Sequence, residues 1–256
     1  MTHGSDTRRV LVTGAAGRIG SAFWRETGGQ YRFRLADREP GPLAEATRAG
    51  HEVVALDVAD PAACRAACDG IDTVVHLAAD PSPEADFYRS LLDNNVKGTY
   101  NVFRAAADRG CRRVVFASSV HAVVGYPVEV PVRPEWPVRP LNMYGVSKCF
   151  GEAVAACFAG AGLSSIAVRI GAYDGPWVRE DPTPDNLTAY LSHRDLNHLL
   201  VRCIETPGIG FAIVHAISDN RRKRVDITST RELLGYAPQD DGFRLLDGAT
   251  REGGQR

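Results

Sequence analysis

Five short apolar runs follow one another in the first half of the chain, and a helical pattern separates each run from the next. The runs cover residues 9–14, 32–37, 52–58, 73–79 and 112–119. Strands that alternate with helices form a parallel sheet, and right-handed crossovers place helices on both of its faces. The sequence therefore predicts an α/β fold with a doubly wound parallel sheet.

The first run ends in a glycine-rich turn, "VTGAAGRIG", which places Gly14, Gly17 and Gly20 between a strand and a helix. Glycine lets the backbone approach a pyrophosphate, and the helix N-terminus offers N–H groups and a partial positive charge. The strand before the turn and the helix after it make this pattern more specific than a lone glycine triplet. It predicts a dinucleotide-binding turn.

A carboxylate at the end of the second run bears on which dinucleotide is bound. Asp37 can accept hydrogen bonds from both ribose hydroxyls and would repel a 2′-phosphate, which favours NAD over NADP. Arg38 follows directly and can bind that phosphate, so the strictness of this preference stays open. An acid after a strand is also an ordinary turn residue. Asp57, near the end of the third run, can reach the adenine amino group or act as a simple turn acid.

Tyr144 and Lys148 stand four residues apart on a predicted helix over 144–162, so both side chains project from one face. A free phenol has a pKa near ~10 and is protonated at neutral pH, but a nearby ammonium favours the phenolate. Such a tyrosine can take a proton from a substrate hydroxyl while hydride leaves the same carbon for nicotinamide. Ser119 ends the fifth run, where it would hydrogen-bond the reacting oxygen.

Composition disfavours other classes of protein. The chain has 30 basic and 31 acidic residues, without the basic excess of a nucleic-acid binder. No run approaches the ~18 apolar residues that span a membrane, and the N-terminus lacks the apolar region of a secretory signal. Six cysteines without a Cys-x-x-Cys pair predict reduced thiols and a cytoplasmic location, and no ligand set for a metal is complete.

After Gly171 the sequence becomes polar and rich in proline and glycine. A helix over 87–110 and a sixth strand over 164–171 precede this point. Beyond it we expect a loop over 172–186, a helix over 192–206, a strand over 210–218 and a capped helix over 227–236. Residues 1–171 are therefore expected to form an NAD-binding Rossmann domain that carries the serine, tyrosine and lysine. Residues 172–256 are expected to form a small substrate-binding lobe packed on the C-terminal edge of the sheet.

Longer segments resemble a known family over nearly the whole chain. "TGAAGRIG", "DVAD", "HLAA", "NNVKGTYN", "YGVSK" and "SHRDL" are similar to the extended short-chain dehydrogenases/reductases. Within that group, "FASSVHAVVGYP", "YGVSKCFGE" and "VRIG" most resemble the NAD-dependent uronate dehydrogenases. The resemblance implies oxidation of a sugar at its anomeric carbon to an aldonolactone. It also implies a homodimer or higher homo-oligomer, formed through helices such as 87–110 and 144–161.

The resemblance further implies roles for individual residues. Catalysis falls to Ser119, Tyr144 and Lys148, and His121 faces the sugar, although from the residues alone His121 could equally pack or cap a loop. The residues expected to bind NAD are Gly14, Gly17, Arg18, Ile19, Gly20, Asp37, Asp57, Val58, Leu77, Ala78, Ala79, Asn95, Tyr144 and Lys148. The residues expected to bind the sugar are Ser119, Val120, His121, Tyr144, Gly171, Ala172 and Arg179.

Two departures from the uronate dehydrogenases bear on the substrate. Val120 replaces an asparagine that contacts the sugar, and Asp185 stands where an arginine binds the uronate carboxylate. Arg179 could supply the missing charge, although an unaligned arginine is more often a solvated surface residue. The run "NRRKR" at 220–224 is either a solvated loop or a site for a larger anion. The predicted substrate is therefore an anionic monosaccharide, either a hexuronate or a hexose with a C6 phosphate or sulfonate.

Two other functions remain open at this point. A nucleotide-sugar epimerase or dehydratase shares the same front half, but an epimerase recycles its cofactor, so net NADH production separates the two. A non-catalytic NAD-sensing module would bind NAD without turnover, and the intact serine, tyrosine and lysine argue against it. The sequence identifies neither the sugar nor the quaternary state.

Overall fold

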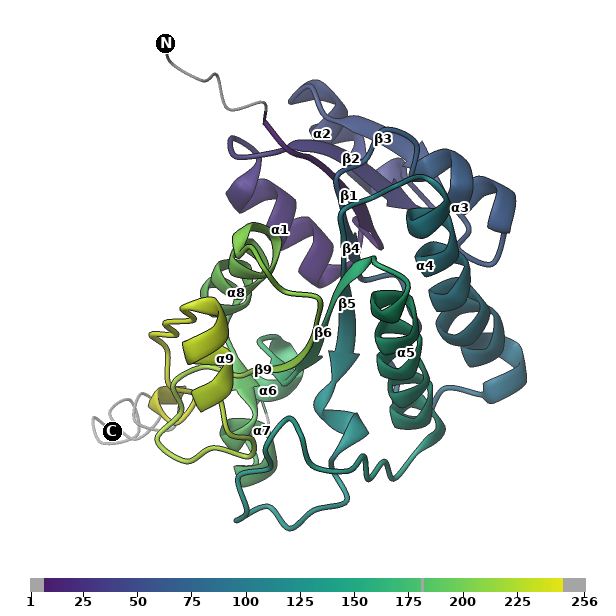
Figure 1. Cartoon of the computed structure of the whole chain (residues 1–256). Helices are drawn as coiled ribbons and strands as arrows, with labels where there is room; N and C mark the ends of the chain where they lie inside the picture. The colour runs from purple at the N-terminus through teal and green to yellow at the C-terminus, as the bar shows by residue number, and fades with distance from the viewer. Residues whose placement is uncertain (1–6, 181, 246–256) are drawn as a thin grey trace.

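Seven parallel strands form one sheet at the centre of the molecule (Figure 1). The computed structural model describes residues 7–180 and 182–245. In spatial order the strands are β3 (Glu52–Ala55), β2 (Arg32–Asp37), β1 (Arg9–Thr13), β4 (Thr73–His76), β5 (Arg113–Ser119), β6 (Ser164–Ile170) and β9 (Phe211–Ala216). The order reverses at β1, because β2 and β3 lie on one side of it and β4 on the other. This confirms the predicted doubly wound sheet and places a ligand crevice at the carboxyl ends of β1 and β4.

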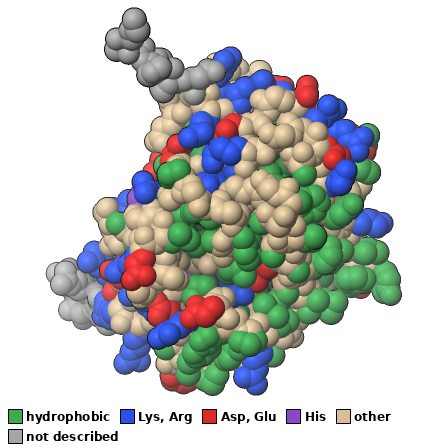
Figure 2. Space-filling view, in the orientation of Figure 1, with side chains coloured by type: hydrophobic (Ala, Val, Ile, Leu, Met, Phe, Trp, Pro, Cys, Tyr) green, Lys and Arg blue, Asp and Glu red, His purple; other side chains and the backbone are tan. Residues whose placement is uncertain are grey.

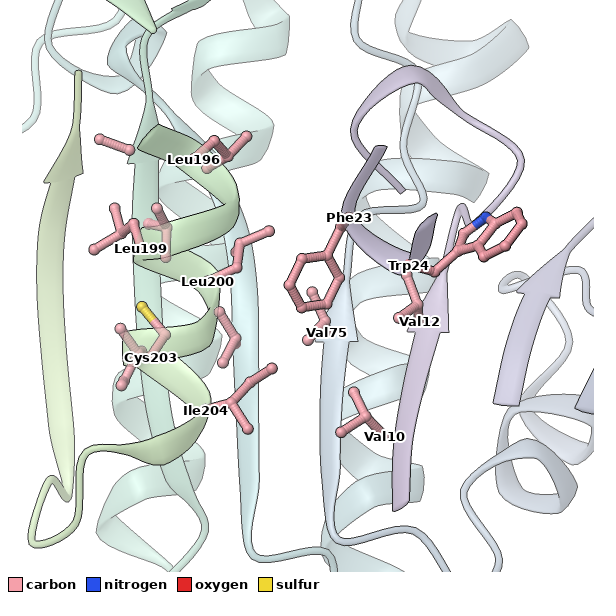
Figure 3. Close-up of a cluster of buried hydrophobic side chains, with 14 of the residues drawn as sticks. Val10, Val12, Phe23, Trp24, Val75, Leu196, Leu199, Leu200, Cys203 and Ile204 are labelled. Carbon is pink, nitrogen blue, oxygen red and sulfur yellow. The ribbon is translucent and has the colours of Figure 1, made fainter. Parts of the chain in front are cut away.

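Helices cover both faces of the sheet (Figure 1). On one face lie α1 (Arg18–Thr27) and α8 (His193–Glu205), and on the other lie α3 (Pro61–Ala67), α4 (Gly98–Asp108) and α5 (Met143–Gly160). Figure 3 shows part of the first layer, in which Leu196, Leu199 and Leu200 of α8 belong to the same buried cluster as Phe23 of α1. Each layer buries its own apolar core, so the sheet is shielded from water on both sides.

The segment predicted as a loop over 172–186 contains regular structure, so that prediction was wrong in part. It holds β7 (Ala172–Tyr173), α6 (Pro176–Glu180) and the start of α7 (Pro184–Thr188), and β7 pairs with β8 (Tyr190–Leu191). Prolines begin both helices, where the missing N–H has no intrahelical partner to lose. The sequence reading took these prolines as loop formers, although they serve here as helix starts.

Other element boundaries also differ from the prediction. The strands predicted over 52–58 and 73–79 end three residues early, at Ala55 and His76. The helix predicted over 87–110 is a π-helical stretch, η2 (Phe87–Lys97), that continues into α4. Shorter elements are η1 (Gly41–Leu43), α2 (Ala44–Arg48), η3 (Val120–Ala122) and α9 (Thr228–Leu234). The predicted glycine stop of α9 is confirmed, because Gly235 has a φ of 64°.

A buried ion pair fixes α5 on the sheet. Arg169 of β6 donates from Nε to Glu152 Oε1 at 2.8 Å and from Nη2 to Oε2 at 2.9 Å, and both side chains are almost fully buried. Ser118 of β5 donates to the same carboxylate at 2.6 Å. Close packing adds to this, since a Cβ at Gly151 would overlap the Phe116 ring. One turn of α5 is therefore held against two neighbouring strands, four residues beyond Lys148.

Residues beyond 171 contribute to the main layers. β9 pairs with β6 along the edge of the sheet, and α8 packs against α1. The domain boundary predicted at residue 171 stays a prediction, and the last residues of the predicted lobe, 246–256, lie outside the described residues. Among the helices that the structure describes, none combines the length and apolar character needed to cross a membrane.

Candidate active site

A cavity of about 1240 Å³ runs along the carboxyl ends of the strands. It begins at the glycine turn after β1 and reaches the end of β6 and the N-terminus of α5. The cavity is lined by most of the residues predicted to bind NAD or sugar, namely Gly14, Gly17, Arg18, Ile19, Gly20, Asp37, Asp57, Val58, Leu77, Ala78, Ala79, Ser119, Val120, His121, Tyr144, Lys148, Gly171 and Ala172. Their roles stay predictions, but the fold brings them to one crevice.

The glycine turn has the shape of a phosphate cradle. Gly14 has a φ of 70°, and a Cβ there would lie 2.8 Å from the backbone nitrogen of Ala78. A Cβ at Gly20 would lie 2.5 Å from Gly14 O. Side chains would therefore force the turn away from the neighbouring strand and close the space that a pyrophosphate needs.

The N-terminus of α1 opens into this cradle. Gly17 caps the helix without a side-chain hydrogen bond, and no acidic residue lies in the first turn. Gly17, Arg18 and Ile19 line the cavity. Because the first N–H groups of a helix have no intrahelical acceptor, they can bind a phosphate oxygen. These features fit the pyrophosphate of NAD.

Asp37 connects the cradle to the adenosine end. Its Oδ2 accepts a hydrogen bond of 3.0 Å from the Ala16 N–H, so the carboxylate also steadies the glycine turn. Arg38 and Asp57 line the same part of the cavity, and Asp57 accepts from the Ala59 N–H at 2.9 Å. A ribose can therefore meet a carboxylate here, with an arginine close by.

Ser119, Tyr144 and Lys148 meet at the other end of the cavity. Ser119 ends β5, and the other two lie on the first turns of α5. Lys148 donates from Nζ to Ala117 O at 2.9 Å, and its nitrogen lies 5.4 Å from the centre of the Tyr144 ring. A Cβ at Gly145 would overlap His121 O, so glycine lets this helix start approach the strand end.

Burial controls the titration of this group. It raises the pKa of Tyr144, and a hydrogen bond with Ser119 acts in the opposite direction. It lowers the pKa of Lys148 to about 8. The sequence predicted that the lysine ammonium would favour the phenolate; in the structure burial is the largest influence on the pKa of Tyr144 and raises it. A positive charge placed close to Tyr144 would lower this pKa.

His121 presents one N–H donor toward the substrate end. Asn142 accepts the Gly145 N–H at 2.7 Å through Oδ1, which fixes its amide, and its Nδ2 then donates to His121 Nδ1 at 3.1 Å. Since Nδ1 accepts, the proton of the neutral ring lies on Nε2. Burial lowers the pKa of His121; Glu84 opposes this and Arg224 adds to it. The neutral form is therefore favoured, with Nε2–H free to meet a sugar oxygen.

Two predicted site residues lie elsewhere. Asn95 is buried and bonds to the backbone of Asp80 and to Ser147 Oγ, so it holds the cavity wall from behind. Arg179 pairs with Asp174 through two hydrogen bonds and is not among the lining residues. Its predicted role in sugar binding stays untested, but the ion pair disfavours it.

Sequence reasoning missed the lining residue Asn142 and did not single out Arg224 from the run at 220–224 that it named as a possible anion site. Asn142 is the N-cap of α5, and an asparagine just before a helix is a recognisable signal. Arg224 was visible only as one of several cations at 220–224. No local pattern distinguishes it, because its position depends on contacts with segments far away in the chain.

Comparisons with known proteins agree with this geometry. Residues 10–203 match the family model described as "NAD dependent epimerase/dehydratase family". An NAD-dependent glucose-6-phosphate dehydrogenase of Haloferax volcanii is 40% identical over 91% of this chain and 93% of its own length. A uronate dehydrogenase of Pseudomonas putida is 35% identical over 91% of this chain and 84% of its own. The crystal structure of uronate dehydrogenase from Agrobacterium tumefaciens has a TM-score of 0.82 at 34% identity, covering 95% of this chain and 89% of that one.

An epimerase is a more distant relative. UDP-glucose 4-epimerase 4 of Oryza sativa subsp. japonica is 30% identical over 72% of this chain, but the match covers only 56% of that protein. The similarity to uronate dehydrogenases that the sequence motifs predicted is thus confirmed, and it extends to a dehydrogenase of a phosphorylated sugar.

Asp37→Asn should weaken the use of NAD and relax the discrimination against NADP. The amide keeps an acceptor for the Ala16 N–H but removes the charge that binds the ribose hydroxyls and repels a 2′-phosphate. Hydrogen bonds to charged groups contribute about 1.5–3 kcal/mol, so kcat/KM for NAD should fall about 10-fold or more. Steady-state kinetics with both cofactors measure this, with Glu39→Gln as a control in the same wall. If the ratio of kcat/KM for NAD to kcat/KM for NADP does not change, another residue determines the cofactor preference.

Lys148→Met should change how stability depends on pH. Since burial lowers the pKa of Lys148 from 10.5 to about 8, the unfolded chain binds a proton between these values that the folded protein does not. The free energy of unfolding of the wild type should therefore rise through this window relative to that of the variant. At 1.36 kcal/mol per pKa unit the full change is about 3.4 kcal/mol, of which about 2 kcal/mol falls between pH 7 and 9.5. Denaturant unfolding of both NAD-free proteins at pH 7 and 9.5 tests it, and an equal difference at both pH values would contradict it.

Proposed function

The chain belongs to the NAD dependent epimerase/dehydratase family, and we propose that it oxidises the anomeric carbon of an anionic hexose to the aldonolactone. It is an NAD-dependent oxidoreductase that acts on a sugar. The proposal rests on one observation: Ser119, Tyr144 and Lys148 line the same cavity as the glycine cradle. A crevice that holds a nicotinamide cofactor beside a proton acceptor suits the removal of hydride and proton from one hydroxylated carbon.

The residues divide the chemistry as follows. Tyr144 accepts the proton of the C1 hydroxyl while the C1–H bond breaks and a C=O bond forms at C1. Ser119 hydrogen-bonds the reacting oxygen. Lys148 donates a hydrogen bond to Ala117 O and so holds this face of α5 against β5. When bound, NAD accepts the hydride and brings the nicotinium charge that offsets the raised pKa of Tyr144.

The substrate's charge is the finer part of the proposal. The two curated relatives described above act, by their names, on glucose 6-phosphate and on uronates, which are both anionic at the C6 end. Asp185 lines the cavity where the resemblance places the carboxylate-binding arginine. We therefore propose a hexose with a C6 phosphate ahead of a hexuronate. We place epimerisation below oxidation as a function, because the match to an epimerase covers little more than half of that enzyme.

We also propose a homo-oligomer whose contact surface lies over η2, α4 and α5. Figure 2 shows hydrophobic side chains gathered over this side of the molecule. The large exposed apolar residues on these three helices are Tyr88, Tyr100, Met143, Val146 and Phe150. Contiguous apolar surface of this kind marks protein contacts. A cytoplasmic location is a further proposal, supported by six free cysteines.

Tyr144→Phe should abolish oxidation and leave NAD binding nearly unchanged, because the ring still packs but the proton acceptor is lost. The expected fall in kcat is about 10²–10⁴-fold. NADH absorbance with glucose 6-phosphate, glucuronate and glucose measures turnover, and calorimetric titration measures NAD binding. Tyr126→Phe, in the neighbouring loop and outside the cavity wall, serves as the control. Near-normal turnover in the first variant would refute the mechanism, and no net NADH from the wild type with any sugar would refute the function.

Phe150→Glu should dissociate the oligomer, since the introduced charge would have to be buried in an apolar contact. Light scattering after size-exclusion chromatography gives the mass of each variant. Leu233→Glu changes a residue of similar exposure on α9, away from the proposed surface, and should keep the wild-type mass. A monomeric wild type, or an unchanged mass for Phe150→Glu, would contradict the proposed surface.

A further inference from the structure

Arg224 brings a cationic donor without a partner to the wall of the cavity. The side chain follows β9 and is only 8% exposed. Its Nη2 donates to Val124 O at 2.7 Å and to Tyr126 O at 3.1 Å. Its Nη1 is buried and has no hydrogen-bond partner among the residues that the structure describes. One half of the guanidinium is thus anchored by two carbonyl groups, and the other half has no hydrogen-bond acceptor among the described residues.

The backbone holds this arginine in place. The Arg224 N–H donates to Thr188 O at 3.1 Å, and its carbonyl accepts from the Val132 N–H at 3.3 Å. Val225, which follows Arg224 in the chain, forms a parallel β-bridge with Val132. Arg224 is therefore clamped between α7 and the loop before α5, so a ligand meets a donor that is already ordered.

The neighbouring cations are engaged or directed elsewhere. Arg221 pairs with Asp241 at 2.9 Å, and Lys223 pairs with Asp219 at 2.8 Å. Arg222 is exposed and does not line the cavity. Among the cations at 221–224, Arg224 alone is a lining residue of this cavity.

Arg224 lies at the sugar end of the crevice rather than at the cofactor end. β4, β5 and β6 separate β9, which it follows, from β1, which leads into the glycine cradle. It shares the wall with Val124, Asn186 and His121. Arg224 acts electrostatically on His121, and the His121 ring lies 5.4 Å from the Tyr144 ring. Arg224 and Tyr144 therefore belong to one cavity wall, and a sugar that reacts at Tyr144 can place another substituent against the arginine.

A buried cation with an unsatisfied donor is costly unless an anion completes it. The guanidinium fork matches the oxygens of a phosphate or a carboxylate. Asp185, exposed on α7, also lines the cavity, and its negative charge opposes an anion that comes close to it. An anion is therefore favoured where it meets the Arg224 guanidinium rather than the Asp185 carboxylate.

We infer that Arg224 binds the anionic C6 group of the sugar and sets the preference for an anionic over a neutral hexose. The inference rests on the proposed function, since it assumes that C1 of a sugar reacts at Tyr144. Arg224 is a specificity residue in this scheme, with no part in proton or hydride transfer.

The test compares kcat and KM for glucose 6-phosphate, glucuronate and glucose in the wild type and three variants. Arg224→Met should raise KM for glucose 6-phosphate about 30-fold or more, the usual effect of removing one member of a buried charge pair. Its kcat, and its KM for glucose, should stay near the wild-type values. Arg224→Lys keeps the positive charge but loses the forked guanidinium, so its KM for glucose 6-phosphate should lie between those of the wild type and Arg224→Met. Arg222→Gln, the matched control, should leave all three sugars unaffected.

A second measurement separates a binding role from a structural one. Inorganic phosphate should inhibit glucose oxidation competitively with glucose in the wild type and lose most of that effect in Arg224→Met. Parallel losses on glucose and glucose 6-phosphate, with a lowered melting temperature, would overturn the inference in favour of a loop anchor. An unchanged ratio of anionic to neutral efficiency in both Arg224 variants would overturn it as well.

Failure of the proposed function gives a different result. If the wild type forms no NADH from any sugar, calorimetric titration with inorganic phosphate still tests the arginine. Phosphate binding that Arg224→Met abolishes and Arg222→Gln preserves would support an anion site there. Equal binding, or none, in the wild type and in Arg224→Met would refute it.

Discussion

The buried pair of Glu152 and Arg169 is the constraint on which the geometry of this molecule depends. It ties α5 to β6, and through Ser118 to β5, at a point where neither charge can reach water. A charge left alone there would cost about 3–5 kcal/mol, so the helix has one register on the sheet. Tyr144 and Lys148 precede Glu152 on the same helix. Their position relative to Ser119 therefore follows from an interaction that takes no part in the chemistry.

Desolvation explains both the strength and the limits of the site. The cradle at β1 works through backbone N–H groups, which keep their polarity whatever the pH. The reacting end depends on two ionisable side chains, and burial pushes both toward their neutral forms. In the proposed mechanism, the positive charge of NAD would lower the raised pKa of Tyr144, so cofactor binding and the proton acceptor would be coupled electrostatically.

Most of the fold and the cofactor half of the site could be predicted from the sequence because their signals are local. Glycine spacing, strand-end acids and a Tyr-x-x-x-Lys helix face each lie within a few residues, and the structure gathers nearly all of them around one cavity. The substrate half could not be predicted in this way. The sequence left two roles open for Arg179 and two for the run that contains Arg224; the structure pairs Arg179 with Asp174 and buries Arg224. Both outcomes depend on contacts between distant segments.

The position of Arg224 so late in the chain has a consequence for how the protein is made. The ribosome delivers the cradle, Ser119, Tyr144 and Lys148 well before β9 and the arginine that follows it. A nascent chain that ends after β6 carries the parts that bind and reduce the cofactor, but one long strand edge has no neighbour. Synthesis of β9 closes that edge and, a few residues later, supplies the cation. The strand that covers the sheet edge and the arginine proposed to select the sugar are therefore made in the same short interval of translation.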